Sequence, residues 1–380
     1  MQQKKLSCCL LIIVGLFFYG YVQSQITLRV SNTHSYPLYN YPVRISLLEI
    51  KDSLAVKKDY QIKDKNTGKN LLLQRIHSQS AEKMEFILFQ DDFKKHEVKF
   101  YTLTAVDKSI STQPSKVFCR FVPERMDDFA WENDRIAFRM YGPSLEQELV
   151  SSGIDVWLKK TSQLVINTWY DRGDYHEDHG QGLDLYSVGP SLGCGGLAIW
   201  HNKNLYSSRN FTSWKIYENG PLRLRFELTY EPWEVNGLLI SETKQISLIA
   251  GHHFNKIKSH FHIQGEEGKV TVAVGLKIHE ELNPHLQSDH NQGWISVWEE
   301  TPENGAYGCA VLMDPGNIKK IIEAEAHILI LTDISDNDTL TYYTGAGWDQ
   351  SESFDSEQDW IDYIGQMAKQ IQGSVGIEFE

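Results

Sequence analysis

Cysteine is scarce in this chain of 380 residues, and its placement excludes two ways of stabilising a fold. Of the five cysteines, two lie within the first ten residues, in a leader-like segment. The other three are widely spaced and odd in number, which provides neither a disulfide framework nor a paired zinc motif. We therefore expect them to be small buried hydrophobic residues. They are Cys119, Cys194 and Cys309.

Several catalytic and nucleotide-binding signatures are also absent from the sequence. It has no glycine-rich nucleotide motif after a strand, no His-Glu-x-x-His motif and no Gly-x-Ser-x-Gly elbow. Cys194, in "SLGCGG", has no recognisable partner base, so a structural role is expected for it. A carboxylate pair for glycoside hydrolysis could be drawn from 50 aspartates and glutamates, and spacing alone does not choose one.

Basic residues are outnumbered by acidic ones, 37 to 50, giving a formal net charge of −13. Phosphate binding requires basic patches, so such a surface disfavours nucleic acid and anionic membranes as partners. The hydrophobic fraction of 41% suits one large domain or two intimate ones.

Long apolar runs are rare, and the clearest one, at residues 10–21, lies near the N-terminus. Two lysines precede it, and Val22 and Ser24 follow it at positions that suit signal peptidase. A transmembrane anchor is the alternative, but the run is too short to span a membrane comfortably. The sequence predicts a signal peptide at residues 1–24, a mature protein in the periplasm and no membrane insertion.

Period-two alternation dominates the rest of the chain. Segments such as "LRLRFELTY", "KIKSHFHIQ" and "KVTVAVGLKI" are rich in β-branched and aromatic residues, and turn sequences such as "PENGAYG" and "DPGN" separate them. One helix is predicted at residues 357–372. We predict a mainly β protein, a large antiparallel β-sandwich over residues 25–380 with a possible small sub-domain at residues 25–122.

The densest polar segment is "WYDRGDYHEDHGQGLDLYSVGPSLGCGG", at residues 169–196. Its glycines make a helix unfavourable and permit close approach of a ligand to the backbone. His176 and His179 could share a metal ion in a tight turn, with Asp178 or Asp184 completing the site. A solvated connection is the alternative.

Two arginines in "WENDRIAFRMYGP" could clamp a carboxylate or sulfate. If this segment is extended, Arg135, Arg139 and Tyr141 lie on the same side. The planar guanidinium group binds such anions through two parallel hydrogen bonds. The alternative is that the arginines form buried pairs with Glu132 or Asp134.

Aromatic and cationic residues also mix at residues 199–230 and again near residue 348. Sugar rings stack on aromatic faces and uronate carboxylates require cations, so these segments suit a sugar acid; ordinary strand packing is the alternative. The residues concerned are Trp200, Lys203, Arg209, Trp214, Lys215, Arg223 and Arg225. In "YYTGAGWDQS", Trp348 follows an expected Gly-Ala-Gly turn, which predicts an exposed indole.

Four phrases, "WENDRIAFRMYGP", "GLDLYSVGPSLGCGG", "NFTSWKIYENGPLRLRFELTYEPW" and "YYTGAGWDQS", resemble a family of exported proteins from polysaccharide-utilisation loci of Bacteroidota. That family is long catalogued as a domain of unknown function, and the likeness covers nearly the whole mature chain. At least one member is an oligosaccharide dehydratase from ulvan degradation. The resemblance implies a galactose-mutarotase-like β-sandwich and removal of water from a terminal uronic acid, although fold kinship alone fixes no activity.

This dehydration requires a cation on the uronate carboxylate, a base for the C5 proton and an acid for the departing 4-hydroxyl. Under the resemblance, the expected base is His176 and the expected acid is Tyr141 or Tyr175. One pocket is expected to contain the catalytic candidates His176, Tyr141, Tyr175, Arg139 and His179. The expected substrate-binding residues are Arg223, Lys203, Trp214 and Trp348.

Other activities use the same residue types. A polysaccharide lyase performs the same β-elimination but expels a sugar, and a non-catalytic glycan-binding protein needs only exposed aromatic residues. A metal-assisted hydrolase would use His176 and His179; the dehydratase scheme itself uses no cofactor.

Overall fold

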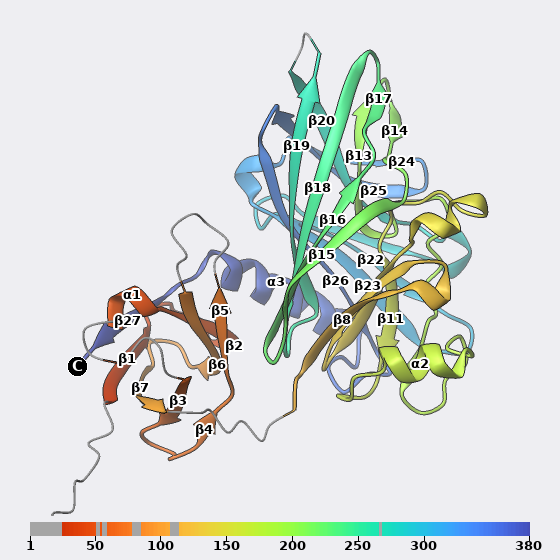
Figure 1. Ribbon diagram of the computed structural model, residues 1–380. Helices are drawn as coiled ribbons and strands as arrows, with labels where there is room; N and C mark the ends of the chain where they lie inside the picture. The colour runs from red at the N-terminus through yellow and green to blue at the C-terminus, as the bar shows by residue number, and fades with distance from the viewer. Residues whose placement is uncertain (1–24, 51–53, 55–58, 78–84, 107–113, 266–267) are drawn as a thin grey trace, which may run out of the picture.

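The computed structural model describes residues 25–380, except 51–53, 55–58, 78–84, 107–113 and 266–267. The predicted signal peptide lies outside the described residues. Within them, no helix is long and apolar enough to cross a membrane. The chain forms a small N-terminal unit and a larger unit, both built from antiparallel sheets (Figure 1). The prediction of a mainly β sandwich protein with few helices is confirmed.

The N-terminal unit contains two sheets, with strand orders β27-β1-β7-β3-β4 and β2-β6-β5. They enclose a separate hydrophobic core that includes Leu28, Ile62 and Phe89. Its elements are β1 (Gln25–Asn32), β2 (Leu38–Ser46), α1 (Leu47–Ile50), β3 (Asp59–Asp64), β4 (Asn70–Leu71), β5 (Leu73–His77), β6 (Glu85–Phe93), β7 (Val98–Val106) and β27 (Val375–Phe379).

The larger unit contains three sheets. Their orders are β12-β11-β10-β9-β8, β14-β13-β20-β25-β24, and β15-β16-β18-β19-β26-β23-β22-β21 with β17 on β18. The first half consists of β8 (Val117–Val122), β9 (Asp128–Asn133), β10 (Ile136–Met140), β11 (Asp155–Lys159), α2 (Ile166–Arg172), β12 (Gly182–Leu183), β13 (Cys194–His201), β14 (Asn204–Tyr206), β15 (Phe211–Asn219) and β16 (Arg223–Tyr230). The second half consists of β17 (Trp233–Val235), β18 (Leu238–Ile249), β19 (Phe254–Gln264), β20 (Lys269–Lys277), β21 (His285–Asp289), β22 (Trp294–Glu300), β23 (Ala306–Met313), β24 (Lys320–Ala324), β25 (His327–Ser335), β26 (Thr339–Trp348) and α3 (Glu357–Gln372). Short 3₁₀ turns lie at Pro123–Arg125, Pro143–Gln147, Glu280–Leu282 and Pro315–Asn317.

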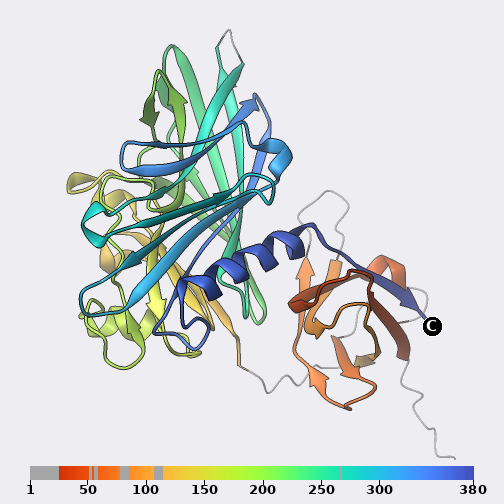
Figure 2. The same cartoon turned by 180° about the vertical axis from the view of Figure 1, so that it is seen from behind.

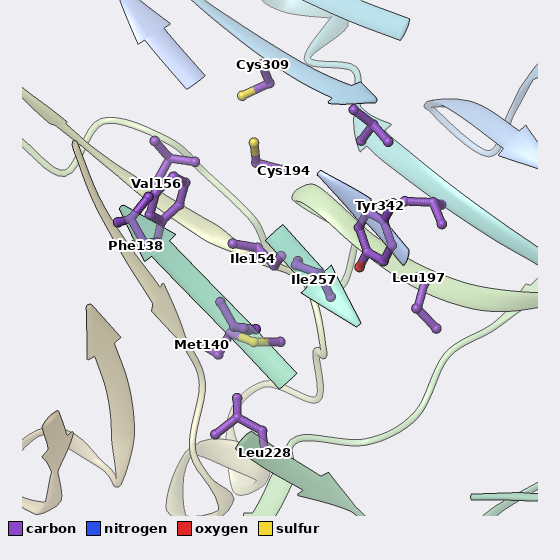
Figure 3. Close-up of a cluster of buried hydrophobic side chains, with 14 of the residues drawn as sticks. Phe138, Met140, Ile154, Val156, Cys194, Leu197, Leu228, Ile257, Cys309 and Tyr342 are labelled. Carbon is purple, nitrogen blue, oxygen red and sulfur yellow. The ribbon is translucent and has the colours of Figure 1, made fainter. Parts of the chain in front are cut away.

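The inner side chains of these sheets form one large core. Figure 3 shows residues from several strands meeting in it, with the sulfur atoms of Cys194 and Cys309 directed toward each other. Cys119 also belongs to this core, where burial raises the pKa of its thiol to about 12. All three cysteines are free and buried, as the sequence predicts.

The C-terminal segment links the two units. Helix α3 occupies the predicted range, and the Ser356 hydroxyl caps it by accepting a hydrogen bond from the Asp359 amide. Trp360 and Ile364 pack its apolar face against the nine-stranded sheet. The chain then adds β27 to β1, so the last strand completes the first sheet (Figure 2).

The structure places β8 in the larger unit, where it pairs with β9. The sub-domain that the sequence suggests at residues 25–122 includes this strand. In the structure, the sheets of the N-terminal unit take β1 to β7 and then the distant β27. A domain boundary placed from local sequence features cannot include a strand such as β27, which comes from the far end of the chain.

Candidate functional site

The polar loop at residues 173–184 is held in place by the helix that precedes it. The backbone amides of Val165 and Ile166, at the start of α2, donate to the Glu132 carboxylate at 2.9 and 2.8 Å. Lys159 donates to the same carboxylate at 2.6 Å, inside the protein. The helix ends at Gly173, whose φ of 80° is the left-handed conformation that favours glycine. A buried charge pair therefore fixes where the loop begins.

Aromatic stacking and one backbone bond fold the loop back onto the sheet. The Trp157 ring, on β11, stacks on Trp169 at 5.4 Å and on Tyr175 at 5.0 Å between centroids. The Asp184 amide donates to the Tyr175 carbonyl at 2.8 Å. Tyr175, His176 and Asp184 are thereby brought next to β10 and β11.

Arg139, on β10, lies beneath this loop and is 4% exposed. Its Nε donates to Asp155 at 2.8 Å, and one terminal nitrogen donates to Asp184 at 3.0 Å. A third carboxylate, that of Asp128, lies 3.8 Å from the guanidinium group. The sequence left open whether Arg139 clamps an anion or forms a buried ion pair. The structure shows a buried ion pair, but its partners are not the expected Glu132 and Asp134. The guanidinium group of Arg139 is therefore engaged by buried carboxylates.

Three buried carboxyl groups around Arg139 exceed the positive charge available to them. Burial raises the pKa of Asp128 to about 6, and it also raises the pKa values of Asp155 and Asp184. Burial alone lowers the pKa of Arg139, but Asp155 and Asp184 outweigh it and raise that pKa. Both oxygens of Asp128 and the hydroxyl of Tyr170 lack hydrogen-bond partners among the described residues. The network thus holds unused polar atoms next to the loop.

Arg125 is a cation of this site that the sequence analysis did not select. Its Nε donates to the Tyr175 hydroxyl at 3.0 Å, and Arg139 donates to the same oxygen at 3.4 Å. The terminal nitrogens of Arg125 have no hydrogen bond or ion pair with the residues that the structure describes, so they can receive an anion. Met126 and Asp127, directly after it, both adopt positive φ, 50° and 64°. Such strain accumulates at functional sites, but it leaves no mark in the sequence.

His176 is the exposed member of the site, with 67% of its side chain accessible. Its Nδ1 lies 3.0 Å from the Asp184 carbonyl oxygen, an acceptor, so we assign the ring proton to Nδ1. The Nε2 lone pair then faces solvent. An imidazole held in one tautomer with a free Nε2 can accept a proton from a bound substrate.

His179 has different partners from His176. Its Nε2 lies 3.0 Å from Asp174, and together with Glu177 these residues bring three ligand atoms within 4.8 Å of one another. This trio could hold a metal ion, and it does not contain His176. The carboxylates proposed from the sequence are engaged elsewhere, because Asp178 pairs with Lys160 and Asp184 with Arg139.

The remaining catalytic candidate, Tyr141, lies at the edge of the network. Its ring is 5.2 Å from the guanidinium carbon of Arg139. The phenol is half-buried, and burial raises its pKa. Arg135, by contrast, lies in the turn before β10 and does not share that strand with Arg139.

The prediction of an exposed Trp348 is wrong. This residue is 2% exposed, and its indole nitrogen donates to the Asn304 carbonyl at 2.7 Å. The preceding Gly-Ala-Gly is no turn but the end of β26. A Cβ on Gly345 would lie 2.0 Å from the His253 carbonyl oxygen, so glycine is required there for close packing. Trp214, in contrast, is 43% exposed on β15 and stacks on Phe121.

The expected convergence of Arg223 with Arg139 is not found. Arg223 lies on β16, in the nine-stranded sheet, and makes two hydrogen bonds of 2.8 Å to Glu218. Arg139 belongs to the sheet β12-β11-β10-β9-β8, and the two arginines share no hydrogen-bond partner. Lys203 lies in the turn between β13 and β14, with φ of 65°. Neither Arg223 nor Lys203 joins the His176 site.

A second buried polar cluster surrounds His279. Its Nδ1 lies 2.9 Å from the Glu299 carboxylate and its Nε2 lies 2.8 Å from the Ser187 carbonyl. The Tyr186 ring packs edge-on against His279, and the Tyr307 ring packs against Tyr186. Because both ring nitrogens already face acceptors, neither is free for a substrate, and the cluster is best explained as support for the loop that follows residue 184.

Comparison with solved structures relates the fold to sugar hydrolases. A protein of glycosyl hydrolase family 38 from Enterococcus faecalis superimposes with a TM-score of 0.52 at 10% identity, covering 95% of this chain and 48% of that one. An alpha-mannosidase from Enterococcus faecalis V583 gives 0.49 at 10% identity, with coverages of 94% and 46%. This chain therefore spans about half the length of these structures, and the first of them supports the fold alone.

Sequence comparison gives closer relatives. An uncharacterised protein from Formosa agariphila, a member of the Bacteroidota, is 34% identical over 337 residues, or 83% of each chain. Residues 30–377 match the family described as "Domain of unknown function (DUF4861)". This match includes both units and the whole His176 site. The chain belongs to that family.

Proposed function

We propose that this protein is an exported carbohydrate-active enzyme that removes water from the terminal uronic acid of an oligosaccharide. The observation that carries the proposal is the placement of His176. Its Nδ1 is fixed by the Asp184 carbonyl at 3.0 Å, its Nε2 is exposed, and a phenol with two guanidinium groups lies beside it. A base, a proton donor and a free cation therefore lie in one loop region.

In this proposal, His176 accepts the C5 proton of the uronate through Nε2. The electrons of the C5–H bond form the C4=C5 double bond, and the C4–O bond breaks. The departing oxygen takes a proton from a phenol, that of Tyr175 or Tyr141, and leaves as water. The product is a 4,5-unsaturated uronate, and no oxidant or reductant is consumed.

The carboxylate of the substrate needs a cation because negative charge develops on it as the C5 proton leaves. Arg125 fills this role better than Arg139, since its terminal nitrogens are unpaired whereas Arg139 faces three carboxylates. Asp155 and Asp184 then act through Arg139 and His176 by holding both in place. We place the mature enzyme, residues 25–380, in the periplasm, acting without a metal ion.

Mass spectrometry of the purified protein incubated with uronate-terminated oligosaccharides tests the proposal. We expect loss of one water from the intact oligosaccharide, together with the ultraviolet absorbance of an unsaturated uronate. Shorter sugar chains with the same absorbance would identify a polysaccharide lyase instead. Binding without any change of mass or absorbance would identify a glycan-binding protein.

A further inference from the structure

A cleft of about 250 Å³ lies where the N-terminal unit, the nine-stranded sheet and helix α3 meet. Figures 1 and 2 show α3 running between the two units at this junction. Three cations from three strands line the cleft: Arg44 on β2, Arg223 on β16 and Lys256 on β19. None of its described lining residues is acidic, although the chain as a whole has a net charge of −13.

More positive charge borders the cleft on the same face of the sheet. Arg225 pairs in register with Ser247, which pairs with Lys256, so these side chains share one face across three strands. Lys258 follows two residues later on that face. The Glu218 carboxylate is bound by Arg223 and Arg225. This single carboxylate offsets one of the five positive charges.

Arg44 and Lys256 have no hydrogen bond or ion pair with any residue in the described part of the chain. Arg44 lies over the Phe86 ring at 3.5 Å and Lys256 over the Tyr343 ring at 5.5 Å. Burial, followed by the charges of Arg223 and Arg44, lowers the pKa of Lys256. Burial and the charge of Arg223 likewise lower the pKa of Arg44. The cleft thus brings together mutually repelling positive charges, whose repulsion a bound anion would relieve.

Hydrogen bonds between the units keep the cleft in shape. Gln74 accepts from the Arg223 amide at 2.7 Å and donates to its carbonyl at 2.9 Å. Gln90 donates to the Ala250 carbonyl at 2.9 Å, and the His252 ring bonds the Asn40 carbonyl at 2.9 Å. A ligand would therefore meet cations already in position, which lowers the entropic cost of binding.

We propose that this cleft binds one sugar residue that carries a sulfate or carboxylate group. The anion contacts Arg44 and Lys256, with Arg223 beside them. Tyr41, Tyr343 and Ile249 supply an aromatic and apolar wall of the kind on which sugar rings pack. The volume lies just below the range of about 300–1,000 Å³ for pockets that hold drug-sized ligands, which suits a single sugar. The site is separate from His176 and does not depend on the proposed reaction.

Isothermal titration of the mature protein tests this inference. The probes are galactose 6-sulfate, galacturonate, galactose and inorganic sulfate, each at one ionic strength set with NaCl. We expect saturable binding of at least one of the two anionic sugars and none of galactose. Inorganic sulfate should bind more weakly than the sugar, because it leaves the aromatic wall empty. Equal binding of inorganic sulfate and the better anionic sugar would overturn the sugar part of the proposal.

Variants locate the binding. Arg44→Gln and Lys256→Gln should each weaken it by about tenfold, since each removes a charged hydrogen-bond donor. Lys320→Gln, which removes an exposed charge from β24, should bind like the wild type. Wild-type binding by both cleft variants, or equal weakening by Lys320→Gln, would overturn the site. Thermal unfolding of each variant checks that it is folded.

The His176→Ala variant separates this inference from the proposed function. It should bind galactose 6-sulfate with wild-type affinity, because this sugar carries no uronate carboxylate for the His176 site to recognise. Loss of binding in His176→Ala, with Arg44→Gln unaffected, would place the anion at the loop site and contradict the cleft. Turnover measurements play no part in this test, so failure of the dehydratase proposal leaves it intact.

Discussion

Arg139 and Arg44 show how differently one residue type is used in the two polar regions of this protein. Arg139 is 4% exposed and faces three carboxylates beneath the His176 loop. Arg44 is exposed at the junction of the units, where it has no hydrogen bond or ion pair with a carboxylate of the described residues, although the charges of Arg223 and Glu218 both act on it. The first region has an excess of acid and the second an excess of base. Whether an arginine can bind a ligand depends on the groups already around it.

The same contrast appears within the loop. His176 and His179 are three residues apart, yet one is held by a backbone carbonyl with a free Nε2 and the other is paired with Asp174 through Nε2. Side-chain type alone therefore does not assign chemistry. The hydrogen-bond and ion-pair partners of each side chain therefore determine how strongly its replacement should affect stability or activity.

Replacing Arg139 should cost the most stability. Arg139→Met leaves Asp155, Asp184 and Asp128 buried without a counter-ion, and removing one partner of a buried ion pair typically costs about 3–5 kcal/mol. Arg44→Met, at the exposed junction, should change the free energy of unfolding by no more than about 0.5 kcal/mol. Chemical denaturation of both variants at neutral pH measures the difference. Equal effects would remove the distinction between the two arginines.

His176→Ala should abolish most turnover while the fold remains intact. Loss of a well-placed general base typically costs about 10²- to 10⁴-fold in rate. Because the side chain is 67% exposed, its removal leaves no cavity, and the denaturation midpoint should stay at the wild-type value. Full activity of His176→Ala on every oligosaccharide that the wild type accepts would show that the base lies elsewhere.

Arg125→Lys should lower kcat/KM by about tenfold or more, because a planar fork that bonds Tyr175 and a carboxylate becomes a point charge. Arg29→Lys is the matched control. Arg29 also bonds a side chain, that of Glu378, but it lies on β1 in the N-terminal unit. If both variants behaved like the wild type, the substrate carboxylate would have another partner.

Much of the fold was predictable because it rests on local patterns. Alternation identified long strands of the larger unit such as β16, β19 and β20, and one apolar face identified α3. Strand β27 was missed because "SVGIEFE" is short and becomes a strand only by pairing with β1 at the other end of the chain. A short stretch of sequence does not show which distant strand it will pair with.

The candidate site was predictable in part for the same reason. The crowded loop and its histidines are visible in the sequence, since polar groups and glycines at that density do not build a core. The partners of Arg139 are not, because strand register places Asp155 directly opposite it on β11. Trp348 was misjudged because glycines typical of a turn lie instead in a close-packed strand.

The Asp128 carboxyl group should make stability depend on pH. Its folded pKa of about 6 lies above the usual value of 3.8 for an aspartate, so the folded state binds its proton more tightly. That stabilisation is complete below about pH 4 and is lost as the pH rises through 6. Asp128→Asn should therefore be more stable than the wild type at pH 7.5, by roughly 1–3 kcal/mol. Chemical denaturation between pH 4 and pH 7.5 should show that the difference in free energy of unfolding between the variant and the wild type shrinks toward pH 4. A difference that stays constant with pH would contradict the prediction.

Disrupting the Asp174, Glu177 and His179 trio should have the smallest effect. His179 is paired with Asp174 and lies outside the network of Arg139, Tyr175 and His176, so the proposed elimination does not require it. His179→Ala, and treatment of the wild type with EDTA, should each leave kcat within about twofold, well short of the 10²-fold expected for a lost base. Glu177→Gln serves as a second change to the trio that leaves His179 in place. Suppose that chelation abolishes activity, that added metal restores it, and that Glu177→Gln loses activity to a similar extent. A mechanism that uses a metal ion at this trio would then replace the metal-free one. Such a result would leave the predicted role of Arg139 unchanged, because its partners lie in the sheet beneath the loop.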